Sequence, residues 1–577
     1  MTAASAIGPS HLPVPVPALA APVRQRLDRN DILMRAMLCT VALCLTVAVL
    51  LPLWALLSKS FQASDGTFVG LSNFRAYAGH AGLAGSIWNS LWIAVLSTLI
   101  CVLLAFVYAY GITRTRMPGR AVFRMIAQIP LLAPSLLPAI SLVYLFGNQG
   151  LAKGLLFGQS IYGPIGIVMG EVFWTFPHAL IIITTALSIS DARLYEASEA
   201  LRATGWRTFR TVTLPGARYG LISATFVVFT LVITDFGVPK VIGGQFNVLA
   251  TDIYKQVVGQ QNFQMGAVVG LILLLPAVLA FLVDRRMQQR QSALLSIRAV
   301  PHAPKPDRRT DLVFLVVCLV MALAILTVIL VAFLASVATF WPYNLVPTFK
   351  NYDFDMMDGG GWGSYYNSLT MAALTSLIGT SVIFFGAYLV EKTPRFQRMR
   401  GLVQFLALLP LAVPGLVLGL GYIFFFNSPA NPLNVLYGTM AILVICTISH
   451  FYSVAHLTAV TALKQIDPEF ETVSASLRVP FYRTFFRVTL PVCLPAILDI
   501  AIYLFVNAMT TVSAVVFLYS PDTTLAAVAV LNMDDAGDVA PAAAMAMMIF
   551  LTTAAVRFLY LGLTRGILAR SQAWRAR

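Results

Sequence analysis

Two stretches of the sequence, DARLYEASEALRATGWRTFRTVTLP at 191–215 and DPEFETVSASLRVPFYRTFFRVTLP at 467–491, resemble each other and align from end to end without a gap. Both begin with aspartate, share Ser, Leu and Arg at matching positions, and end in Val-Thr-Leu-Pro. They are the longest polar and charged stretches between the apolar segments of their halves. This pattern predicts a duplicated chain in which each half exposes one such stretch to water.

The composition is that of a protein with many membrane-spanning segments. Hydrophobic residues make up 58% of the chain, charged residues 11%, and the mean hydropathy is +0.80, whereas soluble proteins are about half apolar and about a quarter charged. The net charge of +15 does not indicate nucleic-acid binding, because the Lys and Arg residues lie in short loops between apolar runs. The six cysteines lie in or beside apolar segments without a CxxC spacing, which predicts small buried side chains and no metal site.

Twelve segments are long and apolar enough to cross a bilayer, which takes about 20 residues in a helix. Six lie in each half, so both halves begin on the same side of the membrane and form parallel repeats. We therefore predict an all-α polytopic membrane protein with about 12 transmembrane helices. The expected helices lie near residues 33–57, 87–112, 125–147, 164–188, 217–238, 264–283, 312–338, 367–390, 402–426, 436–461, 492–518 and 541–562. The expected domains are a disordered cytoplasmic tail (1–30), a first repeat (31–284), an extended cytoplasmic linker (285–311), a second repeat (312–565) and a cytoplasmic tail (566–577).

The distribution of basic residues orients the chain. With both termini in the cytoplasm, 32 of the 39 Lys and Arg residues fall on the cytoplasmic side. Such an excess marks the inner face of a membrane. Both repeated stretches are then cytoplasmic.

Shorter motifs extend the repeat into the apolar segments. Asn-Ser-Leu at residues 89–91 recurs at 367–369, and two prolines in the third segment recur in the ninth. Proline frees backbone carbonyl groups, which must be satisfied where helices pack or line a cavity, so prolines mark candidate bends. The candidate bends are Pro130, Pro134, Pro138, Pro177, Pro410 and Pro414.

Each repeated stretch has the signals of a helix at its start. Asp191 is a favourable N-cap, and Asp467 is followed by Pro468 and Glu469, a cap with proline at the first helical position. Alternating polar and apolar residues then suit an amphipathic helix. A single stretch of this kind is interpreted equally well as a surface helix, but two copies at one place in the topology favour a paired docking surface.

The two stretches resemble the EAA loop in the membrane subunits of binding-protein-dependent ABC importers. The pattern is Glu-Ala-Ala, three residues, Gly, and a closing Leu-Pro. In the first stretch it falls on Glu196, Ala197 and Ser198, with Arg202 at the glycine position and a glycine displaced to Gly205.

The second stretch departs further from the pattern. It has Thr472, Val473 and Ser474 at the Glu-Ala-Ala positions, with Glu471 one position earlier and Arg478 at the glycine position. The resemblance rests on the whole stretch, its duplication and its place in the topology. Because the first stretch keeps Glu-Ala-Ser, it is expected to contribute more to coupling than the second.

The resemblance implies a two-helix turn from each half that fits a groove in a separate cytoplasmic ATPase subunit. Two ATPase copies and a periplasmic solute-binding protein are therefore the expected partners, and Glu196 and Glu471 are candidates to pair with the ATPase. No GxxxxGK[ST] phosphate loop occurs in the sequence, so ATP is expected on the partner, with no cofactor and no catalytic site in this chain. The expected location is the bacterial inner membrane.

The duplicated arrangement, from about residue 30 to 570, resembles fused permeases for ferric iron, thiamine and 2-aminoethylphosphonate. The runs at residues 129–150 and 232–244 resemble the 2-aminoethylphosphonate permeases most. The expected solute is therefore 2-aminoethylphosphonate or a similar phosphonate, with ferric iron or thiamine as alternatives.

Ionisable residues at membrane depth are costly and mark candidate pathway positions. Glu171 and His178 lie two helical turns apart on one face of the fourth helix, and Asp235 lies at the outer end of the fifth. The alternative for Glu171 is a partly hydrated position near the outer interface. Hydroxyl and amide groups suit a zwitterionic or anionic solute, so Asn507, Thr510 and Thr511 complete the candidates.

The main alternative function is an ion-coupled secondary transporter, which can also have twelve helices in two parallel repeats. That class is expected to carry more buried ionisable residues as coupling sites. It also has no need of a duplicated cytoplasmic loop between the fourth and fifth helices. The sequence therefore favours an ABC importer subunit in contact with the lipid bilayer, its ATPases and a binding protein, and not with nucleic acid.

Overall fold

The computed structural model describes residues 29–294, 304, 306–393, 395–467 and 469–571. In this part of the chain nine helices are long and apolar enough to cross a membrane, or up to twelve if each of three bent helix pairs is one span. The protein is therefore an all-α polytopic membrane protein, as predicted, with one short hairpin of strands β1 (Ala338–Phe340) and β2 (Asn344–Pro347).

The helices of the first half are α1 (Arg29–Leu45), α2 (Leu51–Ser60), α3 (Ser72–Gly79), α4 (Ala81–Arg114), α5 (Arg120–Ile126), α6 (Leu136–Phe146), α7 (Pro164–Ser188), α8 (Ala192–Ala200), α9 (Gly205–Thr208), α10 (Leu214–Thr234), α11 (Gly237–Ile242), α12 (Leu249–Tyr254) and α13 (Phe263–Leu294). Those of the second half are α14 (Arg308–Val337), α15 (Gly361–Lys392), α16 (Gln397–Leu408), α17 (Gly415–Phe426), α18 (Met440–Lys464), α19 (Glu469–Ser476), α20 (Phe481–Thr484), α21 (Leu490–Val492), α22 (Leu494–Thr510), α23 (Ala526–Ala536) and α24 (Val539–Ser571).

Three of the predicted spans are bent pairs of helices. The helices meet at 102° between α5 and α6, at 115° between α16 and α17, and at 76° between α21 and α22. The first two breaks fall at Pro134 and Pro414, so the bends expected there are confirmed. Proline lacks an N–H donor and restricts the residue before it, which ends the helix at that point. Pro177, in contrast, lies inside the continuous helix α7.

The first span of each half packs on the other half. Helix α1 packs against α15 and α16, and α14 packs against α4 and α6. Polar contacts at the starts of these helices also join one half to the other. Asp31 forms an ion pair with Arg395, and Asp311 accepts a hydrogen bond of 2.7 Å from the backbone N–H of Arg116. Each half thus holds the other's first helix.

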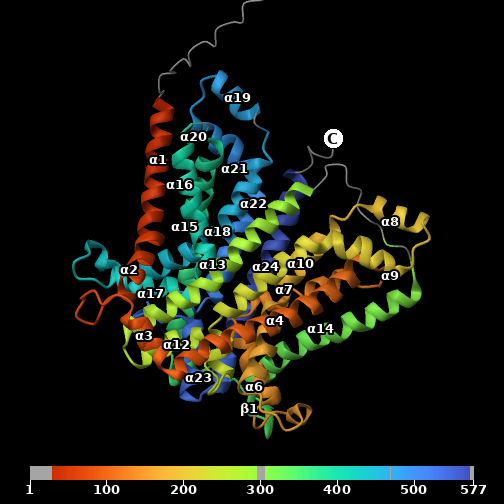
Figure 1. Ribbon diagram of the computed structural model, residues 1–577, viewed down its shortest axis with the longest axis vertical. Coiled ribbons are helices and arrows are strands. Elements are labelled where there is room, and N and C mark those ends of the chain that lie inside the picture. The colour runs from red at the N-terminus through yellow and green to blue at the C-terminus, as the bar shows by residue number, and fades with distance from the viewer. Residues whose placement is uncertain (1–28, 295–303, 305, 394, 468, 572–577) are drawn as a thin grey trace, which may run out of the picture.

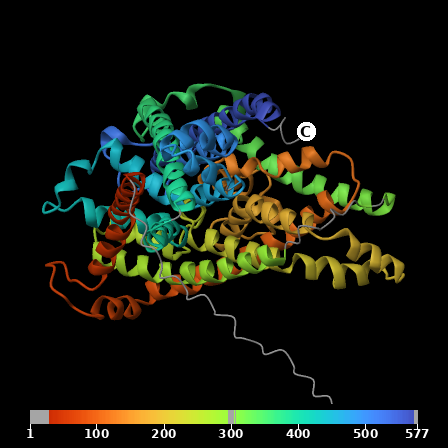
Figure 2. The same cartoon turned by 90° about the horizontal axis from the view of Figure 1, so that it is seen from above.

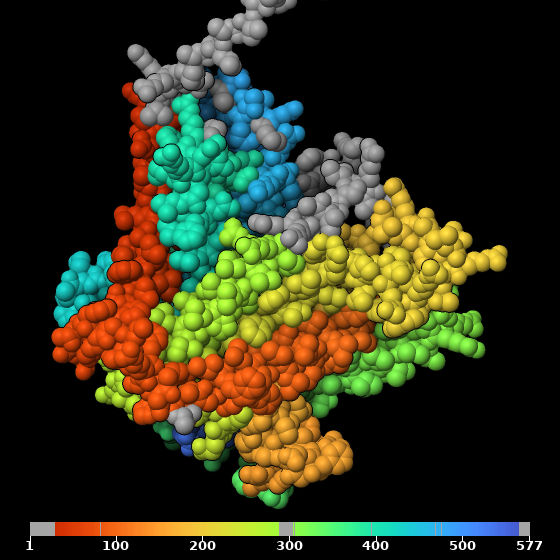
Figure 3. Space-filling view, viewed as in Figure 1, coloured from red at the N-terminus to blue at the C-terminus, as the bar shows by residue number. Residues whose placement is uncertain are grey.

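The helices form two arms that diverge from a shared end (Figure 1). One arm carries α19 and α20 at its tip and the other carries α8 and α9, whereas α12, α23 and β1 lie at the shared end. The view from above shows α8 and α9 projecting away from the teal and blue helices of the second half (Figure 2). In the space-filling view the arms are separate masses above the shared end (Figure 3). The two repeated stretches therefore lie at separate tips.

The repeated Asn-Ser motif fixes a short helix at the shared end in each half. The hydroxyl of Ser90 accepts a hydrogen bond of 2.8 Å from the N–H of Leu249 at the start of α12, and Ser368 accepts one of 2.8 Å from Ala526 at the start of α23. The asparagine of each motif donates to a backbone carbonyl just before the same helix. Because N–H groups at a helix start lack partners within the helix, this motif satisfies them.

The helices extend into both ends of the predicted linker, 285–311. Helix α13 continues to Leu294 and α14 begins at Arg308. Residues 285–294 contain neither Gly nor Pro and are rich in Arg and Gln, which favour helices, so the helix continues beyond its apolar part. The predicted tails fall mostly on residues 1–28 and 572–577, outside the described residues, although 566–571 belong to α24.

The cysteines differ in part from expectation. Cys39 and Cys44 are exposed on α1, whereas the other four are buried. The two exposed thiols lie on a helix that packs on α15 and α16 of the opposite half, and they are on a side that is not covered there.

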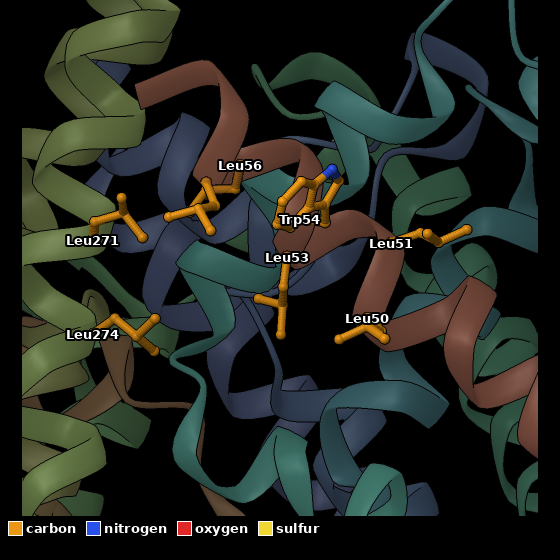
Figure 4. Close-up of a pocket in the computed structure, with 8 residues that line it drawn as sticks. Leu50, Leu51, Leu53, Trp54, Leu56, Leu271 and Leu274 are labelled. Atoms are coloured by element: carbon orange, nitrogen blue, oxygen red, sulfur yellow. The ribbon is translucent and has the colours of Figure 1, made fainter. Parts of the chain in front are cut away.

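An apolar pocket of about 550 Å³ opens between α2 and α13 (Figure 4). Its lining contains leucine and one tryptophan, and none of the predicted pathway residues. Because these side chains offer no partner for a charged group, the pocket is not a candidate pathway for a charged solute. The lining residues are Leu50, Leu51, Leu53, Trp54, Leu56, Leu57, Leu271 and Leu274.

Candidate functional site

Each repeated stretch folds into two short helices joined by a tight turn, α8 with α9 and α19 with α20 (Figure 1). We call these the first and second turn. The carboxylate of Asp191 accepts a hydrogen bond of 3.1 Å from the N–H of Arg193, and that of Asp467 accepts one of 2.9 Å from the N–H of Glu469. These contacts satisfy N–H groups at the helix starts. The predicted cap at Asp191 is therefore confirmed, and Asp467 binds the first N–H of α19, whereas Pro468, predicted at the first helical position, lies outside the described residues.

A hydrogen bond between two hydroxyl groups joins the helices of each turn. Ser198 Oγ lies 2.7 Å from Thr208 Oγ1, and Ser474 Oγ lies 2.5 Å from Thr484 Oγ1. The two pairs occupy the same positions in the aligned stretches. The predicted residues Ser198 and Ser474 therefore hold each turn together from within, and Ser198 is buried.

The bend between the two helices has a backbone conformation that favours glycine. Arg202 has φ of 50° and Arg478 has φ of 51°. The N–H of Ala203 donates to the carbonyl of Ser198 at 3.0 Å, and the equivalent bond of 2.9 Å closes the second turn. A residue with a side chain adopts this conformation at a cost of about 1–2 kcal/mol, which glycine avoids. Each arginine thus stands at the glycine position of the EAA pattern with a backbone conformation that favours glycine. Gly205 instead begins α9.

The outward face of each turn combines predicted residues with apolar ones. Glu196 and Ala197 are exposed in the first turn, as are Thr472 and Val473 in the second. Large apolar side chains are exposed beside them at matching positions, and such groups mark interaction surfaces. They are Leu194, Leu201 and Trp206 in the first turn and Phe470, Leu477 and Tyr482 in the second. Sequence reasoning did not single them out, although an apolar residue repeated at the same offset in a polar stretch was a usable signal.

Glu471 does not belong to this outward face. Its Oε1 lies 3.0 Å from Lys392 Nζ, and the two side chains are 27% and 9% exposed. The equivalent position in the first half is Tyr195, and the guanidinium carbon of Arg114 lies 4.8 Å from the centre of its ring. Contrary to expectation, the Glu471 carboxylate is therefore paired within its own chain. Sequence reasoning missed Arg114 and Lys392, because each is separated from its partner by two whole membrane spans.

Of the predicted pathway residues of the first half, Glu171 and His178 lie within α7 and Asp235 directly follows α10. Glu171 is completely buried, and the ionisable side chain beside it is that of Asp235. Asp235 accepts a hydrogen bond of 2.8 Å from the N–H of Val238 and lies close enough to Glu171 for their charges to interact. The ring of His178 lies 5.7 Å from that of Trp174. With no exposed surface, Glu171 does not occupy the partly hydrated position considered as an alternative.

The candidates of the second half lie at the end of α22. The amide of Asn507 donates to the carbonyl of Tyr503 at 2.8 Å, and the hydroxyl of Thr510 donates to that of Val506 at 3.0 Å. Thr511 is buried and directly follows α22, as Asp235 directly follows α10. Asp235 and Thr511 thus stand at equivalent positions, directly after α10 and α22.

The two halves meet at the shared end through charged groups. Lys240 Nζ of α11 lies 2.9 Å from Asp535 Oδ1 of α23, and 5.1 Å from the centre of the Tyr254 ring. Asp534 adjoins this pair, and its pKa is raised to about 6 by burial and then by the charge of Asp535. The hydroxyl of Thr553 on α24 also donates across the halves, to a carbonyl just before α6, at 2.6 Å.

The sequence of this chain is similar to those of known transport proteins. The sequence profile of one family, described as binding-protein-dependent transport system inner membrane component, matches residues 102–293 and 383–568. The ferric transport system permease protein FbpB of Actinobacillus pleuropneumoniae is 29% identical over 79% of this chain and 67% of that protein. The spermidine/putrescine transport system permease protein PotB of Haemophilus influenzae is 25% identical over 41% of this chain and 88% of that protein. The crystal structure of a bacterial ABC transporter involved in the import of alginate is similar over 46% of this chain and 98% of that chain, with 16% identity and a TM-score of 0.39. Because the family profile matches twice and covers more than half of the residues, this chain belongs to the family of binding-protein-dependent transport system inner membrane components, as an ABC importer permease with two modules fused in one polypeptide.

Proposed function

We propose that this chain forms the membrane pathway of an ATP-driven importer, with one copy of a separate ATPase docked on each turn. The observation that carries the proposal is the matched construction of the two turns. Each has a capped helix, a Ser–Thr hydrogen bond and a left-handed arginine, and each stands at the tip of a separate arm. Two equivalent docking sites suit two copies of one partner.

The arrangement of the arms supports alternating access. An ion pair joins the halves at the shared end, whereas the turns lie apart. With the turns in the cytoplasm, this conformation is closed to the outside and open to the inside. Closure of an ATPase dimer would bring the turns together and separate the shared end, where a solute-binding protein delivers its cargo. The proposed location is the bacterial inner membrane, with both termini cytoplasmic.

We place ferric iron first among the solutes and 2-aminoethylphosphonate second. The FbpB protein of Actinobacillus pleuropneumoniae and a ferric transport permease of Haemophilus influenzae are each 29% identical to this chain, over 79% and 76% of its length. The phosphonate proposal rests on two short runs of sequence resemblance, at residues 129–150 and 232–244. Similarity over most of the chain outweighs similarity over two short runs.

Reconstitution tests both parts of the proposal. The chain is co-purified with its ATPase, placed in vesicles, and supplied with its binding protein loaded with ferric iron, 2-aminoethylphosphonate or thiamine. We expect ATP-dependent uptake of one solute, with stimulation of ATP hydrolysis by the loaded binding protein. Uptake that proceeds without an ATPase and collapses with an ionophore would instead establish an ion-coupled transporter. Uptake of the phosphonate but not of iron would reverse the order of solutes.

A further inference from the structure

The last residue of the second span is a cation in each half, and it contacts the first helix of the adjoining turn. Arg114 ends α4, and Lys392 ends α15, which is the corresponding span of the second half. The guanidinium of Arg114 lies over the Tyr195 ring, and the ammonium of Lys392 pairs with Glu471. Tyr195 and Glu471 stand at the same position of the aligned stretches. A contact between the end of the second span and the docking helix therefore occurs in both halves. It is a cation–π contact in the first half and an ion pair in the second.

Each cation also holds the chain where it leaves the fourth span. Arg114 Nη2 donates to the carbonyl of Leu187, near the end of α7, at 2.6 Å. Lys392 Nζ donates to the carbonyl of Ile466, just beyond α18, at 3.4 Å. Carbonyl groups at a helix end lack partners within the helix and carry partial negative charge, which favours a cation there. A single side chain thus joins the second span, the end of the fourth span and the docking helix.

The first turn has a further hydrogen bond to the rest of its half. The Tyr195 hydroxyl donates to Thr213 Oγ1 at 3.1 Å, so the ring under Arg114 is connected to the point where the chain returns to α10. A docking helix fixed to rigid spans at several points moves with them, whereas a helix held by its ends alone can pivot.

We propose that Arg114 and Lys392 are positioning residues that transmit movement of the docking helices α8 and α19 to the spans α4 and α15. This inference rests on the proposed function, because the movement originates in an ATPase docked on the turns. Helices α4 and α15 pack along α7 and α18 and along α10 and α22, which end at the predicted pathway groups. Displacement of the second span therefore reaches the helices that carry these groups.

The two contacts respond differently to solution conditions. Arginine over an aromatic ring keeps its charge at all physiological pH values and stacks as a plane. A lysine–glutamate pair depends on both charges, and with one partner removed the other is left partly buried without compensation. Substitutions that change charge therefore act most strongly on the second turn, and substitutions that remove the ring or the planar group act most strongly on the first.

The test in the second half uses K392A, E471Q and the charge exchange K392E/E471K, in the complete complex with ATPase and loaded binding protein. The readouts are the amount of co-purified ATPase, basal ATP hydrolysis, and the ratio of stimulated to basal hydrolysis. We expect K392A and E471Q to lower that ratio by about 5-fold or more, as coupling energies of about 1–3 kcal/mol produce, with the ATPase still bound. The exchange variant should recover most of the ratio. K464A and E391Q, which remove charges from neighbouring positions, serve as controls.

The test in the first half uses Y195A, Y195F and R114K. Y195A and R114K remove the stacking and should lower the ratio. Y195F keeps the ring and loses only the hydrogen bond to Thr213, so it should lower the ratio less than Y195A does. R124A removes an exposed arginine from the neighbouring helix α5 and is the control.

The outcomes separate this inference from the proposed function. A wild-type complex without stimulated ATP hydrolysis would overturn the proposed function. A coupled wild type whose ratio is unchanged in K392A, E471Q and Y195A would overturn the inference alone. So would loss of the ATPase itself from these variants, because the cations would then act in docking and not in transmission.

Discussion

Lys240 and Asp535 lie in different halves of the chain, and their charged atoms are 2.9 Å apart at the shared end. Their side chains are 20% and 45% exposed, so the pair is partly screened by water. A pair of this exposure contributes about 1 kcal/mol or less, which is enough to shift a balanced two-state equilibrium about 5-fold. The position of the pair matters more than its energy, because the pair joins the two halves at the end of the molecule opposite to the two turns.

A covalent link at this position should stop transport. In K240C/D535C, a short thiol-reactive crosslinker should hold the shared end closed and abolish uptake in vesicles, and cleavage of the crosslinker should restore it. The K240C single variant treated with the same reagent is the control. Full uptake by the crosslinked protein would show that the shared end does not open during transport.

Asp534 gives the shared end a dependence on pH. Its pKa is about 6 in the folded protein and about 3.9 in an unfolded chain. The folded state therefore binds the proton more tightly, and stability rises as the pH falls through about 6. We expect D534N to melt at a higher temperature than wild type at pH 7.5, with the difference lost near pH 5. D522N, which removes an exposed carboxylate, is the control, and a difference that persists at pH 5 would contradict the assignment.

The two turns should contribute unequally to coupling. Glu196 is exposed and charged in the first turn, whereas the equivalent residue of the second turn is Thr472. A hydrogen bond to a charged group is worth about 1.5–3 kcal/mol, so E196A should lower stimulated ATP hydrolysis about 10-fold or more. T472A should lower it about 2-fold or less, as loss of a neutral hydrogen bond does. Equal defects in the two variants, measured at equal amounts of bound ATPase, would contradict this asymmetry.

Glycine should be preferred to arginine in both bends. Arg202 and Arg478 have left-handed backbone conformations, so R202G and R478G should stabilise each turn locally by about 1 kcal/mol. Hydrogen exchange of the amides that follow each bend should slow accordingly. R202V should accelerate exchange, because a β-branched residue tolerates positive φ least. Faster exchange in R202G would show that the arginine side chain itself holds the bend.

Hydropathy and motif spacing were sufficient to predict the helical membrane fold, the repeat and the capped turns. These features depend on local composition, and Asp191 and Asp467 cap the helices that follow them directly. The prolines predicted the positions of two breaks, but their angles depend on the packing of each second helix. The ion pair between Asp31 and Arg395 was beyond prediction because it joins the first span to a loop of the opposite half.

The candidate site was predictable in its location and less so in its contacts. Position in the EAA pattern identified Glu196, whose exposure agrees with a docking role. The same reasoning named Glu471 as a candidate to pair with the ATPase, because a helix sequence does not reveal which side meets another span. The ion pair with Lys392 shows which side of α19 faces another span, and this pair is visible only in the structure, where α15 and α19 are adjacent.

The exchange of first spans between the halves has a consequence for biogenesis. Helix α1 packs on α15 and α16, so its partners do not exist until the ribosome has synthesised the chain beyond Gly361. At about 5–20 residues per second, synthesis of the chain between Ser60 and Gly361 takes about 15–60 seconds. During that interval α1 has lipid or an insertion factor for a neighbour in place of its native partners. The packing of α1 is thus completed only when α15 and α16 have been synthesised. The C-terminal half then packs against a helix that entered the membrane first.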